Sequence, residues 1–241
     1  MKTMKSKFYS LALAAGMLSL TACSDDNTND SNNDKGNGIE NGSILKGTIT
    51  EDVTLKAGNT YKLSGEYIVE AGATLNIEEG VKIISVYDNI VDYILVKQGA
   101  KINAVGTPDK PIVMTSEKEE PGAWGGIHIC GKAHTNAEGG KGSSEIGGAV
   151  YGGNDDADNS GTLQYIRLEY TGFAFDEEHE ANGISFYGVG NGTIVDHCEA
   201  YKGSDDGFEF FGGSVDVKHM VVTNCSDDSF DWTEGWNGRG Q

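Results

Sequence analysis

One segment of the chain occurs twice, and this repeat restricts the fold more than any other feature of the sequence. Ser204–Phe210 (SDDGFEF) returns as Ser226–Trp232 (SDDSFDW), at an offset of 226 − 204 = 22 residues. A fixed period of this length is typical of solenoids, in which one repeat cannot bury its apolar face alone and stacks on its neighbours. Within each copy aromatic and acidic residues alternate, which is the period of a β-strand and not that of a helix. The repeat therefore predicts a solenoid built of strands.

Apolar residues extend the same period upstream. Three columns line up in successive coils: Leu163/Val195/Val217, Ile166/Cys198/Met220 and Ile184/Phe208/Phe230. Leu163 and Val195 are 195 − 163 = 32 residues apart, and the ten additional residues fall mainly in the loop 173–181. A stacked architecture tolerates insertions at corners while its columns stay in register. We therefore predict an all-β fold, a single-stranded parallel β-helix with about 22 residues per coil, and right-handed because crossover connections favour that hand.

The pattern continues towards the N-terminus in a less regular form. Gly72–Ile84 reads as two short alternating strands split by a turn, and Gly99–Gly106 repeats its start 99 − 72 = 27 residues later. The chain has 35 glycines and 3 prolines, which suits many tight corners between short strands. Between residues 131 and 161 the pattern lapses into a segment rich in Gly, Asn and Asp, for which we predict a loop that covers one face.

Several motifs together resemble a known family. They are Gly-Ala-x-Leu/Ile at 72–75 and 99–102, Gly106–Ile112 (GTPDKPI), Trp124-Gly125-Gly126 and Ser204–Gly213 (SDDGFEFFGG). In this order they resemble bacterial, Bacteroidetes-type surface lipoproteins that have a right-handed parallel β-helix of the pectate-lyase-like superfamily and no settled activity. The resemblance covers roughly residues 65–241 and implies the same fold for this chain.

The N-terminus has the pattern of an exported lipoprotein. Lys2, Lys5 and Lys7 precede the apolar run Phe8–Leu20, which is too short for a mature membrane span. The run ends in Leu-Thr-Ala-Cys23, which resembles a bacterial lipobox, so we predict a signal peptide at 1–22 and lipidation of Cys23. The Ser-Asp-Asp that follows resembles the acidic export signal of Bacteroidetes surface lipoproteins. This resemblance implies an outer-membrane lipid anchor with the protein exposed at the cell surface.

The residues after Cys23 predict the remaining domain boundaries. Residues 23–43 contain almost no apolar side chain and are predicted to form a flexible tether, because they cannot bury enough surface to offset their ordering entropy. The β-helix domain is predicted at 44–241. The sequence stops directly after a complete repeat without a polar cap, and an uncapped strand edge invites aggregation. We therefore predict further coils after Gln241, so that the domain is truncated here.

The charge balance limits the classes of partner. The formal net charge is −19, and the part after the three leader lysines carries 15 − 37 = −22. Such a surface repels nucleic acid and anionic membranes, so no nucleic-acid partner is expected. It could attract divalent cations or basic partners, and a simply solvated acidic face is the alternative.

The repeated aspartates are the first candidate site. If Asp205/Asp227 and Asp206/Asp228 stack in neighbouring coils, like charges lie a few ångströms apart and need relief from a cation, a proton or a backbone donor. Calcium suits hard carboxylate oxygens, so Ca²⁺ is the candidate cofactor. The alternative is that these aspartates form turns by bonding the backbone.

A second candidate metal site lies in the predicted loop. Asp156-Ala157-Asp158-Asn159-Ser160-Gly161 matches the opening of a calcium-loop pattern, and Asp156 and Asp158 are its candidate ligands. The terminal glutamate of that pattern would fall on Arg167, so the bidentate ligand is missing. This motif is the weaker of the two.

No complete set of catalytic residues is found in the sequence. Asp205-Asp206 resembles the acid pair of polygalacturonase-like glycosidases, but the Gly-His-Gly and Arg-x-Lys motifs of those enzymes are absent. Pectate-lyase-like chemistry needs calcium and a basic residue, and only Arg167 and Arg239 are arginines. His197 and His219 align at the repeat offset and read as a stacked corner column. No zinc-ligand spacing, phosphate loop or nucleophile pattern is found.

The aromatic residues suggest a binding function. Tyr187, Tyr201, Phe211 and Trp236 are predicted off the inward columns, where exposed rings could stack on sugars, whereas Trp232 is predicted to lie in the core. We therefore favour a non-enzymatic module that binds extracellular glycan or protein, with Tyr187, Tyr201 and Trp236 as candidate ligand-binding residues. A polysaccharide lyase or glycoside hydrolase acting on an acidic polysaccharide is the first alternative, and a structural spacer is the second.

Three cysteines remain after Cys23. Cys198 falls in a core column and is predicted to be a buried thiol. Cys225 aligns with Gly203 and not with Cys198, so the spacing does not support a disulfide ladder that would include Cys130.

Overall fold

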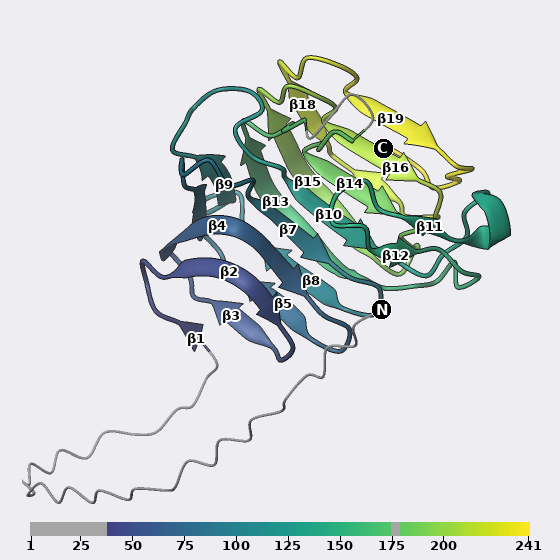
Figure 1. Ribbon diagram of the computed structural model, residues 1–241, viewed down its shortest axis with the longest axis horizontal. Helices are drawn as coiled ribbons and strands as arrows, with labels where there is room; N and C mark the ends of the chain where they lie inside the picture. Colours follow the sequence, from purple (N-terminus) through teal and green to yellow (C-terminus); the bar gives the residue numbers. More distant parts are fainter. Residues whose placement is uncertain (1–37, 175–178) are drawn as a thin grey trace, which may run out of the picture. The chain divides into compact units, whose positions relative to one another are not determined.

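Strands coil around a single apolar core in the computed structural model, which describes residues 38–174 and 179–241 (Figure 1). Within these residues, 17 strands join one sheet and two further strands form a separate hairpin. All neighbouring strands of the large sheet pair in parallel, as one coil lies on the next, so the predicted parallel β-helix is confirmed. The predicted signal peptide, Cys23 and the predicted tether up to residue 37 lie outside the described residues.

Each full coil has three faces. The first face contains β1 (Gly38–Ile39), β3 (Val53–Leu55), β5 (Thr74–Ile77), β8 (Lys101–Val105), the first halves of β13 (Gly161–Glu169) and β15 (Ile194–Tyr201), and β17 (Val217–Lys218). The second contains the first halves of β2 (Ile44–Ile49) and β4 (Thr60–Val69), then β6 (Lys82–Ser85), β9 (Ile112–Ser116), the second halves of β13 and β15, and β18 (Val221–Thr223). The third contains the second halves of β2 and β4, then β7 (Tyr93–Val96), β10 (Ile127–Cys130), β14 (Ile184–Tyr187), β16 (Phe208–Phe211) and β19 (Phe230–Thr233).

The β-helix begins earlier than the sequence predicted. β1 pairs with β3, so Gly38 and Ile39 already belong to the first coil. Asn41 also contributes, since its Oδ1 accepts a hydrogen bond from the backbone of Thr60 at 2.8 Å. The sheet therefore starts before residue 44, because a short polar segment can join a sheet through its backbone.

Coil length varies along the domain. The predicted 22 residues hold between β16 and β19 (230 − 208), but β5 and β8 are 101 − 74 = 27 apart, and β10 and β14 are 184 − 127 = 57 apart. The long coil contains the predicted loop 131–161. Apart from a shift between β2 and β4 at Leu45–Gly47, the strands keep their register because the additional residues lie at corners.

Left-handed residues form the corner between the first and second faces. Tyr165, His197 and His219 have φ angles of 52°, 54° and 51°, and each lies at or next to the bend of its strand. Non-glycine residues adopt this conformation rarely, so its recurrence at one register position shows that the stacked coils impose it.

The predicted inward columns are confirmed. Leu163 pairs with Val195 and Val195 with Val217, while Ile184, Phe208 and Phe230 follow one another in β14, β16 and β19. In the remaining column, Ile166 pairs with Cys198. The residues of the three columns are buried except Met220, which is partly buried, and Phe230, which is 39% exposed in the last described coil.

The burial predicted for Trp232 is wrong. Trp232 is in register with Phe210 as expected, but it is 61% exposed, because no coil among the described residues lies over β19. An inward position buries a side chain only where coils lie on both sides of it.

The segment 131–161 covers the outside of the third face, as predicted. It contains a 3₁₀ turn, η1 (Glu138–Gly140), and the hairpin of β11 (Gly142–Ser143) and β12 (Val150–Tyr151). Ile146, Ala149 and Tyr151 form a second apolar cluster with outward residues of the third face, namely Tyr93, Leu95, Cys130, Tyr187 and Phe211. The expectation that Tyr187 and Phe211 are exposed is therefore wrong. Both point away from the inner core, and the hairpin buries them.

The cysteines are as the sequence indicated. Cys130 and Cys198 are buried free thiols, and Cys225 is a partly buried free thiol. An added Cβ at Gly203 would lie 3.2 Å from the Cys225 sulfur, which confirms the predicted alignment. Among the described residues, no helix is long and apolar enough to cross a membrane.

Truncating a ring in the inner aromatic stack should destabilise the fold. Phe186 is fully buried, and its ring stacks on Phe210 with the centroids 5.1 Å apart. Phe186→Ala removes a large buried side chain, so we expect the free energy of unfolding to fall by about 3–5 kcal/mol in urea titrations. Val221→Ala, at a site 50% exposed, is the control and should cost under about 0.5 kcal/mol. Equal effects of the two substitutions would contradict this assignment of the core.

Candidate functional site

A column of glycines brings the backbones of successive coils together at the entrance to the third face. Gly126, Gly183 and Gly207 directly precede β10, β14 and β16. A Cβ at Gly183 would lie 2.3 Å from the carbonyl oxygen of Gly207, and one at Gly126 would lie 2.1 Å from that of Asn182. Only glycine fits such an approach. The residues just before Gly183 and Gly207, Asn182 and Asp206, are therefore held on adjacent coils.

Five carboxylates gather at this entrance, and we call them the acidic cluster: Asp205, Asp206, Glu209, Asp227 and Asp231. Oxygens of Asp205, Asp206 and Asp227 lie within 4.8 Å of one another, and so do those of Asp206, Glu209 and Asp231. Glu209 and Asp231 stack because they pair in register on β16 and β19. Asp206 belongs to both groups and links them.

Asn182 and Glu145 border the acidic cluster. Asn182 is 1% exposed, and its Nδ2 donates to Glu209 Oε2 at 2.6 Å and to Ser185 Oγ at 3.1 Å, while its Oδ1 has no hydrogen-bond partner among the described residues. Glu145, from the hairpin segment, lies 3.5 Å from the hydroxyl of Tyr187. Its charge acts on Glu209, so the hairpin adds a further acid to this region.

Burial raises the pKa values of these acids. It raises the pKa of Glu209 to about 9, helped by the charges of Glu145 and Asp206 and opposed by the hydrogen bond from Asn182. Burial raises the pKa of Asp206 to about 7 and that of Asp205 to about 6, with help from acidic neighbours. The pKa of Glu145 rises to about 7 for the same main reason, although the nearby His179 opposes the rise. At neutral pH the acidic cluster therefore contains both protonated carboxyls, such as Glu209, and ionised carboxylates, such as Asp205.

The backbone gives the acidic cluster little relief. The Asp228 N–H donates to Asp206 Oδ1 at 2.9 Å, which lowers the pKa of Asp206 but does not offset burial. The charges that act most strongly on Asp205 and Asp206 all belong to acids: Glu180, Asp227 and Asp231, and for Asp206 also Asp205. The Asp206 N–H lowers the pKa of Asp205 but does not offset burial. Closely spaced, partly buried carboxylates of this kind favour either protonation or a bound cation.

Three of the four repeated aspartates come together as the sequence indicated. Asp205, Asp206 and Asp227 form one group, while the exposed Asp228 contributes its backbone N–H. The group of three carboxylates is what the cation interpretation requires. The hydrogen bond from the Asp228 backbone to Asp206 is of the kind that the turn interpretation requires. Glu209 and Asp231 were missed, although their alternation with Phe208, Phe210, Phe230 and Trp232 already placed them outward on adjacent strands.

The weaker calcium-loop motif has other hydrogen-bond partners. Asp156 Oδ1 accepts from the backbone N–H of His134 at 3.1 Å and lies 2.7 Å from its Nδ1. Asp158 is 8% exposed, and its Oδ2 accepts from Ser160 Oγ at 3.0 Å. Among the described residues, neither belongs to a group of three convergent ligands.

The candidate aromatic residues do not form one platform. Tyr187 was predicted to bind a ligand because it was expected to be exposed, but the hairpin buries it. The Arg167 guanidinium lies over the Tyr201 ring, 4.3 Å from its centroid. Trp236 stacks on Phe210 with the centroids 4.5 Å apart, at the open end of the core. Trp236 and the exposed Trp232 line an apolar pocket of about 450 Å³ at that end.

These features define a parallel β-helix whose third face starts at a group of partly buried acids. The family model for the pectate-lyase-like β-helix domain matches residues 47–241, and the chain belongs to this family. The predicted right-handed β-helix is that of this family. No curated protein and no solved structure matches the chain.

The pKa of Glu209 predicts a pH dependence of stability. Its pKa is raised from 4.5 to about 9 on folding, so the folded state holds the proton more tightly than the unfolded state. The stabilisation is complete below about pH 4.5 and is lost as the pH rises to about 9. In calcium-free buffer, Glu209→Gln should therefore reduce the fall in Tm between pH 5 and pH 9. Glu138→Gln, at an exposed turn, is the control, and identical slopes for both variants would contradict the assignment.

Proposed function

We propose that this protein is a lipid-anchored cell-surface module that binds extracellular glycan through a calcium ion held by the acidic cluster, without cleaving the glycan. The observation that carries this proposal is the convergence of five carboxylates with no opposing positive charge among their strongest neighbours. A bound cation would relieve both their burial and their mutual repulsion.

The donor set fits calcium. Ca²⁺ takes about six to eight hard oxygen ligands, and carboxylate and amide oxygens are its usual protein ligands. The acidic cluster offers carboxylates from two adjacent coils. Asn182 adds a buried amide oxygen beside Glu209 that has no hydrogen-bond partner among the described residues. Loss of the Glu209 proton on binding would complete an all-oxygen set.

The exposure of the acidic cluster supports an external ligand. Asp227 is exposed and Asp205 is half-buried, so one side of a bound ion would face solvent. Water would complete the coordination sphere on that side, and oxygens of another molecule can replace bound water. Glycans present hydroxyl and carboxylate oxygens at high density, which favours them over a protein surface. The net charge of −19 repels an acidic glycan, and a calcium ion that binds both the acidic cluster and the glycan would overcome this repulsion.

The surroundings of the acids disfavour the enzyme alternative. Pectate-lyase-like chemistry needs a basic residue beside the acids, whereas the charges that act most strongly on Asp205 and Asp206 belong to other acids. The raised pKa of Glu209 is nonetheless what a general acid needs, so the test below includes assays for cleavage. A structural spacer would bind neither calcium nor glycan.

Calcium should stabilise the protein and enable glycan binding. At a free concentration 100 times its Kd, a single site adds about 2.7 kcal/mol to the free energy of unfolding. We expect a higher Tm in calcium than in excess EDTA and binding to an array of acidic polysaccharides only with calcium. Asp206→Asn should weaken both effects, while Asp216→Asn, which alters an exposed pair with Arg239, should not. No calcium-dependent shift would reject the metal site, and release of reducing ends or unsaturated products would favour an enzyme.

The proposed anchor can be tested by one substitution. Cys23 is the residue that the lipobox-like sequence would present for acylation. In a bacterial host, Cys23→Ser should abolish incorporation of labelled palmitate and move the protein from the membrane to the soluble fraction. Cys130→Ser, which alters a buried thiol, should leave both unchanged. Membrane retention of the Cys23→Ser protein would contradict the lipid anchor.

A further inference from the structure

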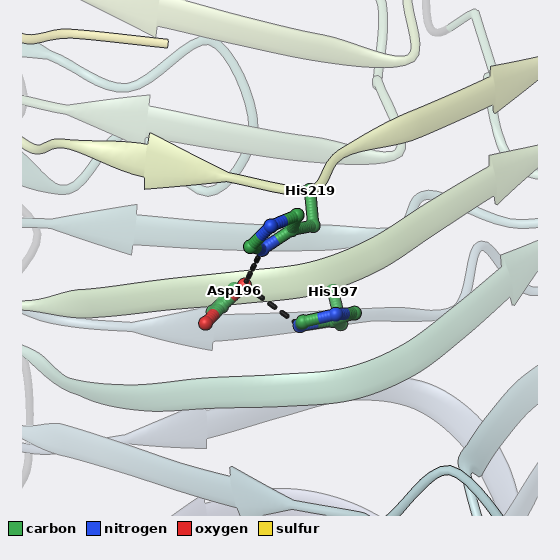
Figure 2. A group of neighbouring side chains, drawn as sticks. All are labelled: Asp196, His197 and His219. Carbon is green, nitrogen blue, oxygen red and sulfur yellow. Dashed lines mark hydrogen bonds and ion pairs between the residues drawn. The ribbon is translucent and has the colours of Figure 1, made fainter. Parts of the chain in front are cut away.

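A second polar cluster lies at the corner between the first and second faces (Figure 2). Asp196 and His197 are adjacent on β15, and His219 occupies the position of His197 one coil later, between β17 and β18. This corner is distinct from the entrance to the third face, where the acidic cluster lies. The three side chains come together because Asp196 and His197 straddle the bend, while the 22-residue repeat brings His219 beside them (219 − 197).

Both histidines direct Nδ1 at the same carboxylate oxygen. Nδ1 of His219 and Nδ1 of His197 each lie 2.7 Å from Asp196 Oδ1 (Figure 2). The two imidazole rings stack with centroids 4.3 Å apart, and Tyr165 stacks on the other side of His197 at 4.5 Å. Asp196, His197 and His219 each offer one potential ligand atom, and these three atoms lie within 4.8 Å of one another.

Hydrogen bonding accounts for only one of these two short contacts. His219 Nδ1 forms a hydrogen bond with Asp196 Oδ1. His197 Nδ1 is inaccessible to solvent and has no hydrogen-bond partner among the described residues, since its approach to the carboxylate lacks hydrogen-bond geometry. The His197 ring nitrogen thus faces the carboxylate at ion-pair distance but outside hydrogen-bond geometry.

The backbone holds the three residues in place. His197 and His219 both have left-handed φ angles, which the stacked corner imposes. The column is fixed from inside by the buried Val195 and Cys198, which flank Asp196 and His197. The His219 N–H also donates to the carbonyl of Gln241 at 2.7 Å. The donor atoms are thus brought together by the register of the coils and not by chance contacts of flexible side chains.

We propose that Asp196, His197 and His219 form a binding site for a divalent transition metal such as Zn²⁺. Imidazole nitrogen suits zinc, copper and nickel, whereas calcium prefers oxygen ligands, so this site and the acidic cluster select different cations. Zinc bonds to nitrogen and oxygen are about 2.0–2.2 Å, which places tetrahedral ligand atoms about 3.3 Å apart. The present separations of 2.7 Å therefore widen by about 0.6 Å on binding.

The exposure of the site indicates exchangeable binding. The side chains of His219, His197 and Asp196 are 59%, 39% and 25% exposed, so the imidazoles can turn towards a shared ion and the ion remains open to solvent. Closed structural zinc sites use four protein ligands, whereas three ligands leave a position for water or an external ligand. The protein would thus bind zinc at a surface site that is separate from the calcium site proposed at the acidic cluster.

Zinc titration of the full chain by calorimetry in calcium-containing buffer at pH 7 tests the proposal. We expect one Zn²⁺ per chain at this site, and at least about tenfold weaker binding in His197→Asn and in His219→Asn, since each removes one of three ligands. Asparagine is chosen because it tolerates the left-handed backbone. His134→Asn, which alters a histidine paired with Asp156, is the matched control and should bind zinc as the wild type does.

Two further readouts keep the test decisive. Replacing Zn²⁺ by Co²⁺ should give visible absorption bands that both histidine variants lose. Urea titrations in EDTA establish that each variant folds, and the 59% exposed His219 is the more tolerant position. No zinc uptake by the wild type, or uptake that neither histidine variant weakens, would overturn the proposal.

Discussion

Parallel stacking in strict register is the constraint on which the rest of the structure depends. Each strand residue lies on its counterpart in the next coil, so the strands place like on like. For apolar residues this is favourable, as in the stacks of Phe186 on Phe210 and of Phe208 on Phe230. For charged residues the same geometry is costly, and Glu209 and Asp231 are brought together by the register that stacks Phe208 on Phe230. The core and the acidic cluster therefore have one cause.

Local backbone features convert this register into two different sites. Close approach at Gly183 and Gly207 holds Asn182 and Asp206 on adjacent coils, where the hairpin segment then adds Glu145. Left-handed corners at His197 and His219 instead present imidazoles beside Asp196. Hard oxygen ligands thus collect at one corner and nitrogen ligands at another. A repeated sequence with small differences between its copies is enough to build both.

The sequence predicted most of the fold and part of the site. The 22-residue offset predicted the strand register, because β-helix coils repeat the same positions, and three of the repeated aspartates meet as that register requires. Burial was harder to predict where it depends on neighbours outside the repeat. Tyr187 was predicted exposed and is covered by the hairpin, whereas Trp232 was predicted buried and lies on an uncovered coil. Glu145 and Asn182 reach the site through long connections whose paths no periodicity specifies, and the ligands Asp196, His197 and His219 show no familiar metal spacing.

Proton release on calcium binding tests the central claim most directly, namely that buried carboxyls of the acidic cluster bind a cation in place of protons. At pH 7 Glu209, with a pKa of about 9, holds a proton, and Asp206, with a pKa of about 7, is about half protonated. Calorimetry in buffers of different ionisation enthalpy should therefore show about one to two protons released per calcium ion. Glu209→Gln should lower that number by about one. Calcium binding without proton release, or no binding at all, would contradict the account.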